Sequence, residues 1–291
     1  MTNTTLTVPT VQDIASRLMP AQIRFNGQER PLGEFVAEDR RSARERRSGD
    51  PLAIFCRFAA ALLERNVSGA SYFRRIDVFG RTFGAPGDPS GGQSGFARNR
   101  YFEGKLLVER DFDDEQAYRL LRESGYRYPS KGSATLVKVV ESLTVPGFRW
   151  AQYLAEAEVK WESGFREDPL RTINGIGDKT RDFALSEFSD YYCAPDLHVG
   201  RMMARTGLIL HGIGDPSLST VDFGFIRKVI GQLARSTGWP EVSGGLSPAH
   251  IDRVFWYYGQ DRKRCGATPN CEDCPANDTC LTGVHRTRPL A

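Results

Sequence analysis

A cysteine-rich loop near the C-terminal end constrains this chain more than any other feature of its sequence. Cys265, Cys271, Cys274 and Cys280 follow the spacing C-x5-C-x2-C-x5-C, and the chain has 6 cysteines in all. The residues between the four are rich in Gly, Pro, Asn and Asp, which favour turns over helices and strands. Four thiols in such a segment can converge on one centre, so we expect this part of the chain to fold around a metal group.

Three kinds of centre are compatible with four thiols. Two disulfides are disfavoured, because the N-terminal residues do not resemble a secretion signal and thiols stay reduced in the cytosol. Structural zinc sites usually pair two short Cys-x(2–4)-Cys units, whereas here only Cys271 and Cys274 form such a unit. The lone cysteine on each side favours a [4Fe–4S] cluster, which four thiolates can ligate, and zinc is the alternative.

The composition is that of a folded protein. Of the 291 residues, 40% are hydrophobic and 26% are charged. That is enough apolar material for the core of one large or two small domains, and it excludes a chain that is disordered throughout. No apolar run approaches the length of a membrane span, and the N-terminal residues lack the basic-then-apolar order of a signal peptide. We therefore expect a cytoplasmic protein with no membrane partner.

Positive charge is concentrated in two short runs. The formal net charge of +3 is only mildly basic, so any contact with nucleic acid must come from local patches. The first run covers residues 40–47, where a solvated helix face is an equally good interpretation. The second run, Arg262, Lys263 and Arg264, directly precedes Cys265. Its place beside the cysteine loop makes it a candidate phosphate contact.

Apolar residues recur at helical spacing along most of the chain, and clear strand alternation is absent. The Gly-, Pro- and Ser-rich residues 84–104 are expected to form a loop or an insertion. We therefore predict an all-α protein with two helical lobes. The expected helices cover residues 52–66, 113–125, 133–143, 149–163, 179–192, 199–210, 223–238 and 248–259.

A glycine-flanked turn at Gly175-Ile176-Gly177 separates the end of a short helix near Ile173 from a helix that starts near Lys179. Glycine permits backbone angles that other residues avoid, and successive N–H groups beside a helix N-terminus form an anion site. Ile176 would anchor the turn in its own core. This is how a helix–hairpin–helix element holds a DNA backbone without reading sequence. Taken alone, the motif is equally an ordinary helix corner capped by glycines.

A lysine and an aspartate flank the helix that follows this turn. Lys179 lies at its start, where the positive end of the helix dipole disfavours the protonated amine. Asp196 lies in the return loop after Pro195, and a carboxylate there could accept the lysine proton. The pair could make an amine nucleophile, although each residue considered singly is equally a surface lysine and a helix cap.

In combination, these motifs resemble those of the endonuclease III family of helix–hairpin–helix DNA glycosylases. The matching segments are Ile173–Thr180 for the hairpin, Asp196–Val199 for the aspartate loop, and the four-cysteine loop, with Gly125–Lys131 and Ala61–Asn66 as looser matches upstream. The resemblance implies two α-helical lobes, one holding the hairpin and the other holding an iron–sulfur cluster and built from both chain ends. DNA would lie across the cleft between them.

The resemblance also implies roles for single residues. Lys179 takes the position of the nucleophilic lysine of bifunctional members, and Asp196 takes that of the catalytic aspartate. Asn66 falls where classical members have a glutamine that fills the gap left by a flipped base, and His198 would orient the Asp196 loop. The four cysteines take the cluster positions. The residues implied to contact DNA are Gly175, Ile176, Gly177, Thr180, Asn66, His198, Arg262, Lys263 and Arg264.

Three departures from the family pattern concern the substrate more than the fold. The first cysteine gap is one residue shorter, residues 84–104 look like an insertion, and Arg181 replaces the apolar residue usual after the start of the hairpin helix. We expect three parts: an N-terminal extension of unknown role (1–50), a helical lobe with the hairpin at 170–192 (51–210), and a cluster lobe completed by N-terminal helices (211–291).

The activity implied is excision of a damaged or modified base that has been flipped from double-stranded DNA, with lyase activity that nicks the strand by β-elimination. We expect a monomer.

One alternative function is that of a non-catalytic or structure-specific DNA-binding protein, which uses the hairpin and the cluster for docking alone. Another is an enzyme that acts on modified or hypermodified bases in phage DNA or its restriction. Trp256, Tyr257 and Tyr258, before the cysteine loop, are interpreted as core residues.

Overall fold

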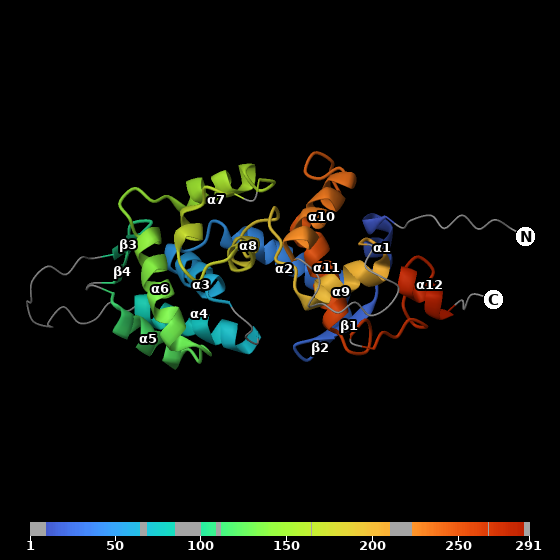
Figure 1. Ribbon diagram of the computed structural model, residues 1–291, viewed down its shortest axis with the longest axis horizontal. Helices are drawn as coiled ribbons and strands as arrows, with labels where there is room; N and C mark the ends of the chain where they lie inside the picture. Colours follow the sequence, from blue (N-terminus) through green and yellow to red (C-terminus); the bar gives the residue numbers. More distant parts are fainter. Residues whose placement is uncertain are drawn as a thin grey trace, which may run out of the picture. The chain divides into compact units, whose positions relative to one another are not determined.

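The computed structural model describes residues 10–64, 69–84, 100–108, 112–163, 165–209, 223–266 and 268–287. These residues are mostly helical, which confirms the predicted all-α class (Figure 1). The chain divides into two compact units: unit 1 comprises Met1–Ser42 with Cys193–Ala291, and unit 2 comprises Ala43–Tyr192. Each unit has its own hydrophobic core.

Unit 1 is built from both ends of the chain. Its core joins apolar side chains of the N-terminal helix and hairpin to those of the helices after residue 193. Its elements are α1 (Val11–Leu18), β1 (Gln22–Phe25), β2 (Gln28–Pro31), α2 (Leu32–Arg46, which continues into unit 2), α9 (Leu197–Thr206), α10 (Phe223–Ser236), α11 (Pro248–Gln260) and α12 (Leu281–Thr287).

Unit 2 is a continuous stretch of chain that contains the glycine-flanked turn. Its α5 packs against α6, and α3 packs on both α4 and α8. Its elements are α3 (Pro51–Leu62), α4 (Gly69–Gly84), β3 (Arg100–Phe102), β4 (Lys105–Val108), α5 (Asp114–Glu123), α6 (Pro129–Leu143), α7 (Trp150–Val159), the 3₁₀ turn η1 (Pro169–Thr172) and α8 (Asp178–Ser186).

The helix starts follow local capping chemistry. The Ser247 hydroxyl accepts the N–H of His250, and Pro248 occupies the first turn of α11. Asp50 and Asp113 cap α3 and α5 in the same way. Such caps satisfy backbone donors that the helix leaves without partners. All eight helices expected from the sequence are present, with ends shifted by a few residues.

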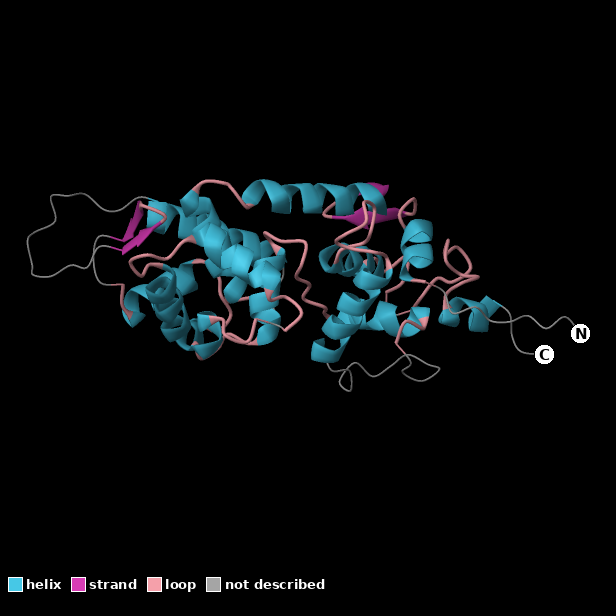
Figure 2. Cartoon of the chain, turned by 90° about the horizontal axis from the view of Figure 1, so that it is seen from above, coloured by secondary structure: helices cyan, strands magenta, loops and turns pink. Residues whose placement is uncertain are grey.

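Two small β-hairpins were not predicted (Figure 2). β1 pairs with β2 across Asn26 and Gly27, and β3 pairs with β4 across Glu103 and Gly104; all four turn residues have positive φ. Strands of three or four residues are too short to display the alternation that marks a strand in a sequence. The second hairpin also occupies the end of the expected insertion at 84–104, of which residues 85–99 lie outside the described part of the chain.

The unit boundaries differ from the divisions expected at 50/51 and 210/211. The helix α9 belongs to unit 1, because Val199, Met202 and Met203 are buried in that unit's core. Residues 11–36 lie within the N-terminal extension whose helices were expected to complete the cluster lobe, and they contribute Val11, Ile14 and other apolar side chains to the core of unit 1.

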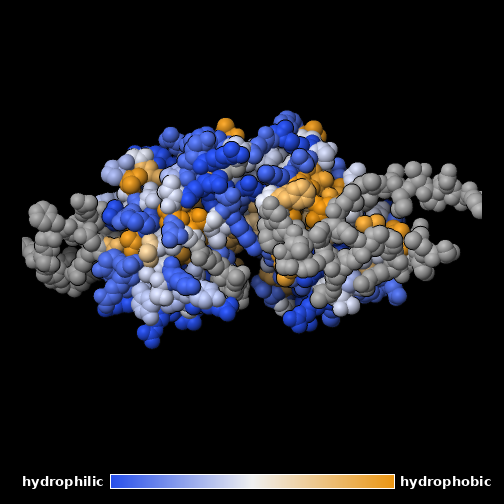
Figure 3. Space-filling model, in the orientation of Figure 1, coloured by the Kyte–Doolittle hydropathy of each residue, from blue (hydrophilic) through white to orange (hydrophobic). Residues whose placement is uncertain are grey.

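The surface of the described residues is largely hydrophilic on the face shown in Figure 3, with small separate apolar areas. None of the described helices combines the length and apolar character that crossing a membrane requires.

Candidate functional site

The turn at residues 173–177 in unit 2 is a rigid hairpin. Gly175 has a φ of 98°, which only glycine adopts readily, and the Ile176 N–H donates to the carbonyl of Ile173 at 3.0 Å. Ile176 is buried in the core of unit 2, as predicted for a residue that anchors the turn. From α6, the Thr135 hydroxyl donates to the carbonyl of Asn174 at 2.9 Å. The backbone of the hairpin is therefore held from both sides.

The outer side of the hairpin is open. Gly177 is exposed, and a Cβ placed on it would meet no atom within 4 Å. Its N–H donates to the Thr180 hydroxyl at 3.2 Å, and that hydroxyl donates to the Gly177 carbonyl at 3.0 Å. The Thr180 hydroxyl thus caps the first turn of α8 by bonding both backbone groups of Gly177. Lys179 lies in the first turn of this helix with its side chain exposed. An anion could approach the hairpin without meeting a side chain at Gly177.

A buried cluster of charged side chains, centred on Arg181, connects α8 to the chain segment before the hairpin. Arg181, where the family pattern has an apolar residue, has no exposed surface. Its guanidinium donates to Asp182 at 2.8 Å and to the carbonyl of Phe165 at 3.4 Å, and it lies 3.8 Å from Asp168. Tyr153 donates its hydroxyl to the same Asp168 carboxylate at 3.0 Å. Paired carboxylates thus compensate the buried charge, so Arg181 anchors the helix that carries Lys179.

A cationic and aromatic patch lies at the start of α6, in the segment 125–131. Tyr128 is 38% exposed, with the guanidinium of Arg127 at 5.2 Å and the ammonium of Lys131 at 6.0 Å from its ring centre. Arg74 of α4 lies beside Gly125. Neither Arg127, Lys131 nor Arg74 forms an ion pair with another described residue. Because α6 also contacts the hairpin through Thr135, this patch and the hairpin belong to one continuous framework in unit 2.

In unit 1, the Asp196 carboxylate is fixed by three N–H donors. Its Oδ1 accepts the backbone N–H groups of His198 at 2.8 Å and Val199 at 3.2 Å, which makes Asp196 the N-cap of α9. Its Oδ2 accepts the indole N–H of Trp256 at 3.1 Å. Asp196 is only partly buried, and hydrogen bonds fix both of its carboxylate oxygens.

Two neighbours of Asp196 have roles that sequence reasoning stated differently or missed. Trp256 was interpreted as a core residue, yet it is half-buried and its polar edge binds Asp196. His198 has its Nδ1 3.2 Å from the carbonyl of Gly259 on α11. It therefore fixes the Asp196 loop to α11, which agrees with the expected orienting role and leaves its contact with DNA a prediction.

The four cysteines of the C-terminal loop line one cavity. Its other lining residues include Arg205, Arg264, Asn277 and Thr282. The Arg205 guanidinium is buried and donates to the carbonyls of Cys265 and Gly266, at 3.1 and 2.6 Å, and lies 3.5 Å from the Cys265 sulfur. Tyr258 of α11 donates its hydroxyl to the Cys274 sulfur at 3.3 Å. Donors aimed at sulfur are typical of the surroundings of metal-bound thiolates.

The four thiols on one cavity are a donor set for either an iron–sulfur cluster or zinc. The described residues form no preassembled group of three or more His, Cys, Asp or Glu side chains that could hold a metal ion. Burial raises the pKa of Cys280 to about 11, and burial also raises the pKa of Cys265 despite the nearby Arg205. Binding a metal group would therefore have to release thiol protons. The donor set fits an iron–sulfur cluster and leaves zinc as the alternative.

Of the basic residues before this loop, Arg264 forms a hydrogen bond within unit 1, whereas Arg262 and Lys263 are exposed. Arg262 and Lys263 are exposed, as a phosphate contact requires. Arg264 is half-buried, and its Nε donates to the carbonyl of Gln22 at 3.0 Å. Asp261 organises the turn, because its carboxylate accepts the backbone N–H groups of Arg24 and Lys263.

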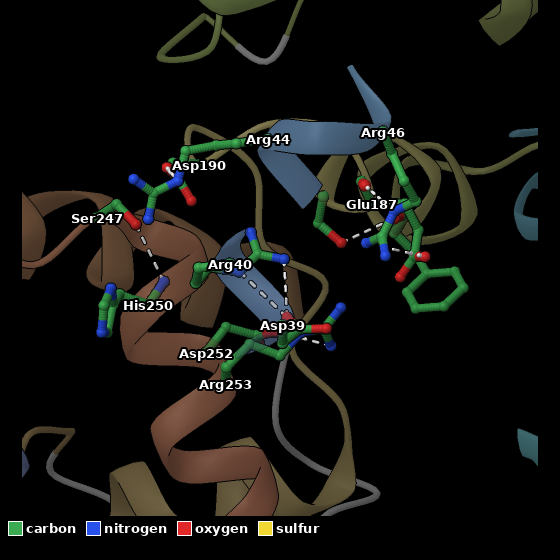
Figure 4. A network of polar contacts seen from close by, with 12 residues as sticks. Asp39, Arg40, Arg44, Arg46, Glu187, Asp190, Ser247, His250, Asp252 and Arg253 are labelled. Atoms are coloured by element: carbon green, nitrogen blue, oxygen red, sulfur yellow. Dashed lines mark hydrogen bonds and ion pairs between the residues drawn. The ribbon is translucent and has the colours of Figure 1, made fainter. Parts of the chain in front are cut away.

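The run at residues 40–47 is a solvated helix face only in part: Arg41, Arg44 and Arg47 are exposed. Arg40 is completely buried and pairs with Asp39 at 2.9 Å. Arg46 and Arg47 pair with Glu187 and Glu158 of unit 2. Glu158 and Glu187 are distant in sequence from this run, so the basic residues alone cannot reveal these two pairings. Figure 4 shows the Arg40–Asp39 and Arg46–Glu187 contacts around α2.

Two predicted site residues need separate mention. Asn66 lies outside the residues that the structure describes. Lys179 belongs to unit 2 and Asp196 to unit 1, and each is described within its own unit.

Comparison with known proteins extends the description of the fold. No protein-family model matches the chain, and no curated protein matches its sequence. Among solved structures, the chain is similar to the 8-oxoguanine DNA glycosylase of Thermotoga maritima, with a TM-score of 0.50 and 20% sequence identity over 78% of this chain and 89% of that chain. At this identity the likeness shows a shared helical fold, and the activity has to be argued from the residues.

Proposed function

We propose that this protein is a DNA glycosylase of the endonuclease III type, which excises a damaged or modified base from double-stranded DNA and nicks the strand as a lyase. The observation that carries the proposal is the hairpin of unit 2. It combines a backbone turn with an open outer side and an exposed lysine in the first turn of the following helix. The fold likeness to a DNA glycosylase supports the glycosylase part of this proposal.

DNA would be held through its backbone. The hairpin offers a phosphate the positive end of α8 and a surface without side chains at Gly177. Arg127, Lys131 and Arg74 add cations on the same unit, and Arg262 and Lys263 add two more on unit 1. Contacts of this kind position a protein on DNA without reading its sequence. Their sum would give binding that weakens steeply with salt.

The chemistry would use Lys179 and Asp196. The base must first leave the duplex, which costs a few kcal/mol of unstacking. The Lys179 amine then bonds to C1′ of the sugar as the bond from C1′ to the base breaks and its electron pair leaves with the base. Asp196 takes the amine proton and offsets the positive charge that develops on the sugar. Opening of the sugar ring gives a Schiff base, and loss of a C2′ proton expels the 3′ phosphate and nicks the strand.

The cysteine loop would hold a [4Fe–4S] cluster through Cys265, Cys271, Cys274 and Cys280. Bound there, the cluster would supply a rigid structural centre. Arg205 and Tyr258 would stabilise the thiolates by donating hydrogen bonds to sulfur. Purified protein with a cluster is brown and contains iron and sulfide in equal amounts, whereas a zinc site gives colourless protein with zinc.

A docking role without catalysis is the second candidate. The hairpin and the cationic patches serve docking as well as they serve catalysis. Helix capping accounts for the two backbone donors to Asp196, but it does not account for the Trp256 indole, which holds the second carboxylate oxygen. This observation favours an enzyme over a binding protein.

Borohydride trapping tests the proposed function. The protein is incubated with duplex DNA that carries one abasic site, and borohydride reduces any Schiff base to a stable adduct. We expect an adduct with the wild type, none with Lys179→Ala, and an undiminished one with Lys138→Ala, whose exposed lysine on α6 pairs only with Glu141. Wild-type protein that binds DNA and forms no adduct would rule out the lyase. A panel of duplexes with damaged and modified bases would then identify the base that is excised.

A further inference from the structure

One face of α11 lies against the start of α9 in unit 1. Asp252, Trp256 and Gly259 are spaced i, i+4 and i+7, which places them on the same side of a helix. Trp256 donates to the Asp196 carboxylate, and the Gly259 carbonyl meets the His198 ring. Gly259 permits this close approach, because a Cβ there would lie 3.0 Å from the His198 carbonyl oxygen.

We propose that two residues on this face of α11 control the reactivity of Asp196. Trp256 positions the Asp196 carboxylate, and Asp252 is a buried acid whose charge acts on that carboxylate. The inference rests on the proposed function, because Asp196 has to be the catalytic carboxylate for the two residues to affect a reaction.

Trp256 is suited to positioning because its own ring is held. Phe25 and Tyr257 pack edge-on against the indole, with ring centres 5.6 and 5.0 Å away, and the Arg253 guanidinium lies 5.9 Å from its centre. The indole N–H therefore has a fixed direction, and it is the donor that holds Oδ2 of Asp196. The two backbone donors hold only Oδ1, so without the indole Oδ2 would lose the donor that fixes its direction.

Asp252 is buried with incomplete partners. It is 3% exposed, and its Oδ1 accepts no hydrogen bond. The charged groups that act on it are Arg253 on its own helix, Arg40 and Asp39 on α2, and Asp196 at the start of α9. Figure 4 shows the first three of these beside Asp252. Arg40 and Arg253 are already engaged with Asp39, at 2.9 Å each. The two arginines therefore compensate Asp252 only in part.

As a consequence, the Asp252 carboxyl group changes its charge near neutral pH. Burial raises the pKa of Asp252 to about 7, the negative charge of Asp196 adds to the rise, and Arg253 and Arg40 oppose it. Above that pH a second negative charge lies near Asp196. That charge would strengthen the negative potential around Asp196 and would help to offset positive charge on the sugar. Base excision should therefore accelerate as pH rises through about 7.

The positioning contact can be observed directly by NMR. The chain has 4 tryptophans, so ¹⁵N-labelled protein gives four indole N–H signals, and the signal lost in Trp256→Phe belongs to Trp256. We expect that signal to move upfield in Asp196→Asn, because the indole then faces a neutral amide. Trp239→Phe, in the same unit, serves as the control that removes a different signal and leaves activity unchanged. A Trp256 signal that does not respond to Asp196→Asn would overturn the positioning role.

Single-turnover excision rates between pH 5.5 and 8.5 test the effect on catalysis. We expect Trp256→Phe to slow excision by about 10- to 100-fold, the range for loss of a hydrogen bond to a charged group, with DNA affinity unchanged. We expect Asp252→Asn to abolish the rise near pH 7. If Trp256→Phe does not fold, benzothienylalanine at position 256 keeps the ring shape and removes only the N–H.

The outcomes separate the two proposals. Wild-type protein that neither excises a base nor forms an adduct contradicts the proposed function, and the NMR signal still reports on the Trp256–Asp196 contact. Active wild type, with Trp256→Phe at full rate and Asp252→Asn keeping the rise near pH 7, overturns this inference and leaves the proposed function standing.

Discussion

Replacing Asp252 by Asn should change how the stability of this protein depends on pH. Burial is the main cause that raises the pKa of Asp252 from 3.8 to about 7. A carboxyl with a raised pKa keeps its proton in the folded state while the unfolded chain loses it. Its stability contribution is complete below the unfolded pKa of 3.8 and declines as pH rises toward the folded pKa of about 7. At 1.36 kcal/mol per pKa unit, the decline amounts to about 4 kcal/mol in the free energy of unfolding.

Asn cannot ionise, so the free energy of unfolding of Asp252→Asn does not fall with pH for this reason. Relative to the wild type, the variant should gain about 1 kcal/mol for each pH unit between pH 4 and 7, and nothing further above pH 8. Urea denaturation followed by circular dichroism at several pH values measures the difference. Glu34→Gln, which removes an exposed carboxylate on α2, should give a curve parallel to that of the wild type. Parallel curves for Asp252→Asn would show that Asp252 titrates as an ordinary carboxyl and would refute the reasoning.

Three further predictions concern the hairpin and the thiol loop. Arg181→Met should lower the free energy of unfolding by about 3–5 kcal/mol in urea denaturation, because it leaves buried carboxylates uncompensated, whereas Arg171→Met, with a partly exposed partner, should cost less than about 1 kcal/mol. Thr135→Val removes the hydroxyl that holds the hairpin, so duplex affinity measured by fluorescence anisotropy should fall by about 5-fold without loss of fold; unchanged affinity contradicts this. Cys271→Ser should lose the visible absorbance and iron of the purified protein, while Cys193→Ser, a buried cysteine outside the loop, should keep both.

Local signals in the sequence accounted for much of the fold. The start of α11 followed from Ser247 and Pro248, and the hairpin followed from Gly175 and Gly177, because caps and glycine turns depend on neighbouring residues. The helix α4 was missed because its first residues, Gly69 to Ser71, are poor helix formers. The core of unit 2 holds this helix through buried side chains such as Phe79 and Phe83.

The parts that were missed depend on contacts between distant segments. Trp256 gave no sign of its bond to Asp196, because the pairing requires α9 and α11 to pack together. Arg181 was noted as a departure from the family pattern, yet its burial depends on Asp168 and Tyr153 from an earlier part of the chain. The 3₁₀ geometry of η1 before the hairpin was likewise unforeseen, since a helical period does not distinguish it from a short α-helix.

The same two helices, α9 and α11, contact both the cysteine loop and the Asp196 carboxylate, so the structure of the loop can affect the position of the carboxylate. The helix α9 begins at Asp196 and reaches Arg205, whose guanidinium binds the carbonyls of Cys265 and Gly266 and whose own carbonyl accepts the Cys280 thiol. The helix α11 carries both Trp256, which binds Asp196, and Tyr258, which binds Cys274. Both helices that orient the carboxylate are therefore fixed at the loop. A cluster that tightened the loop would restrain them together, and it could sustain catalysis through geometry without taking part in the reaction.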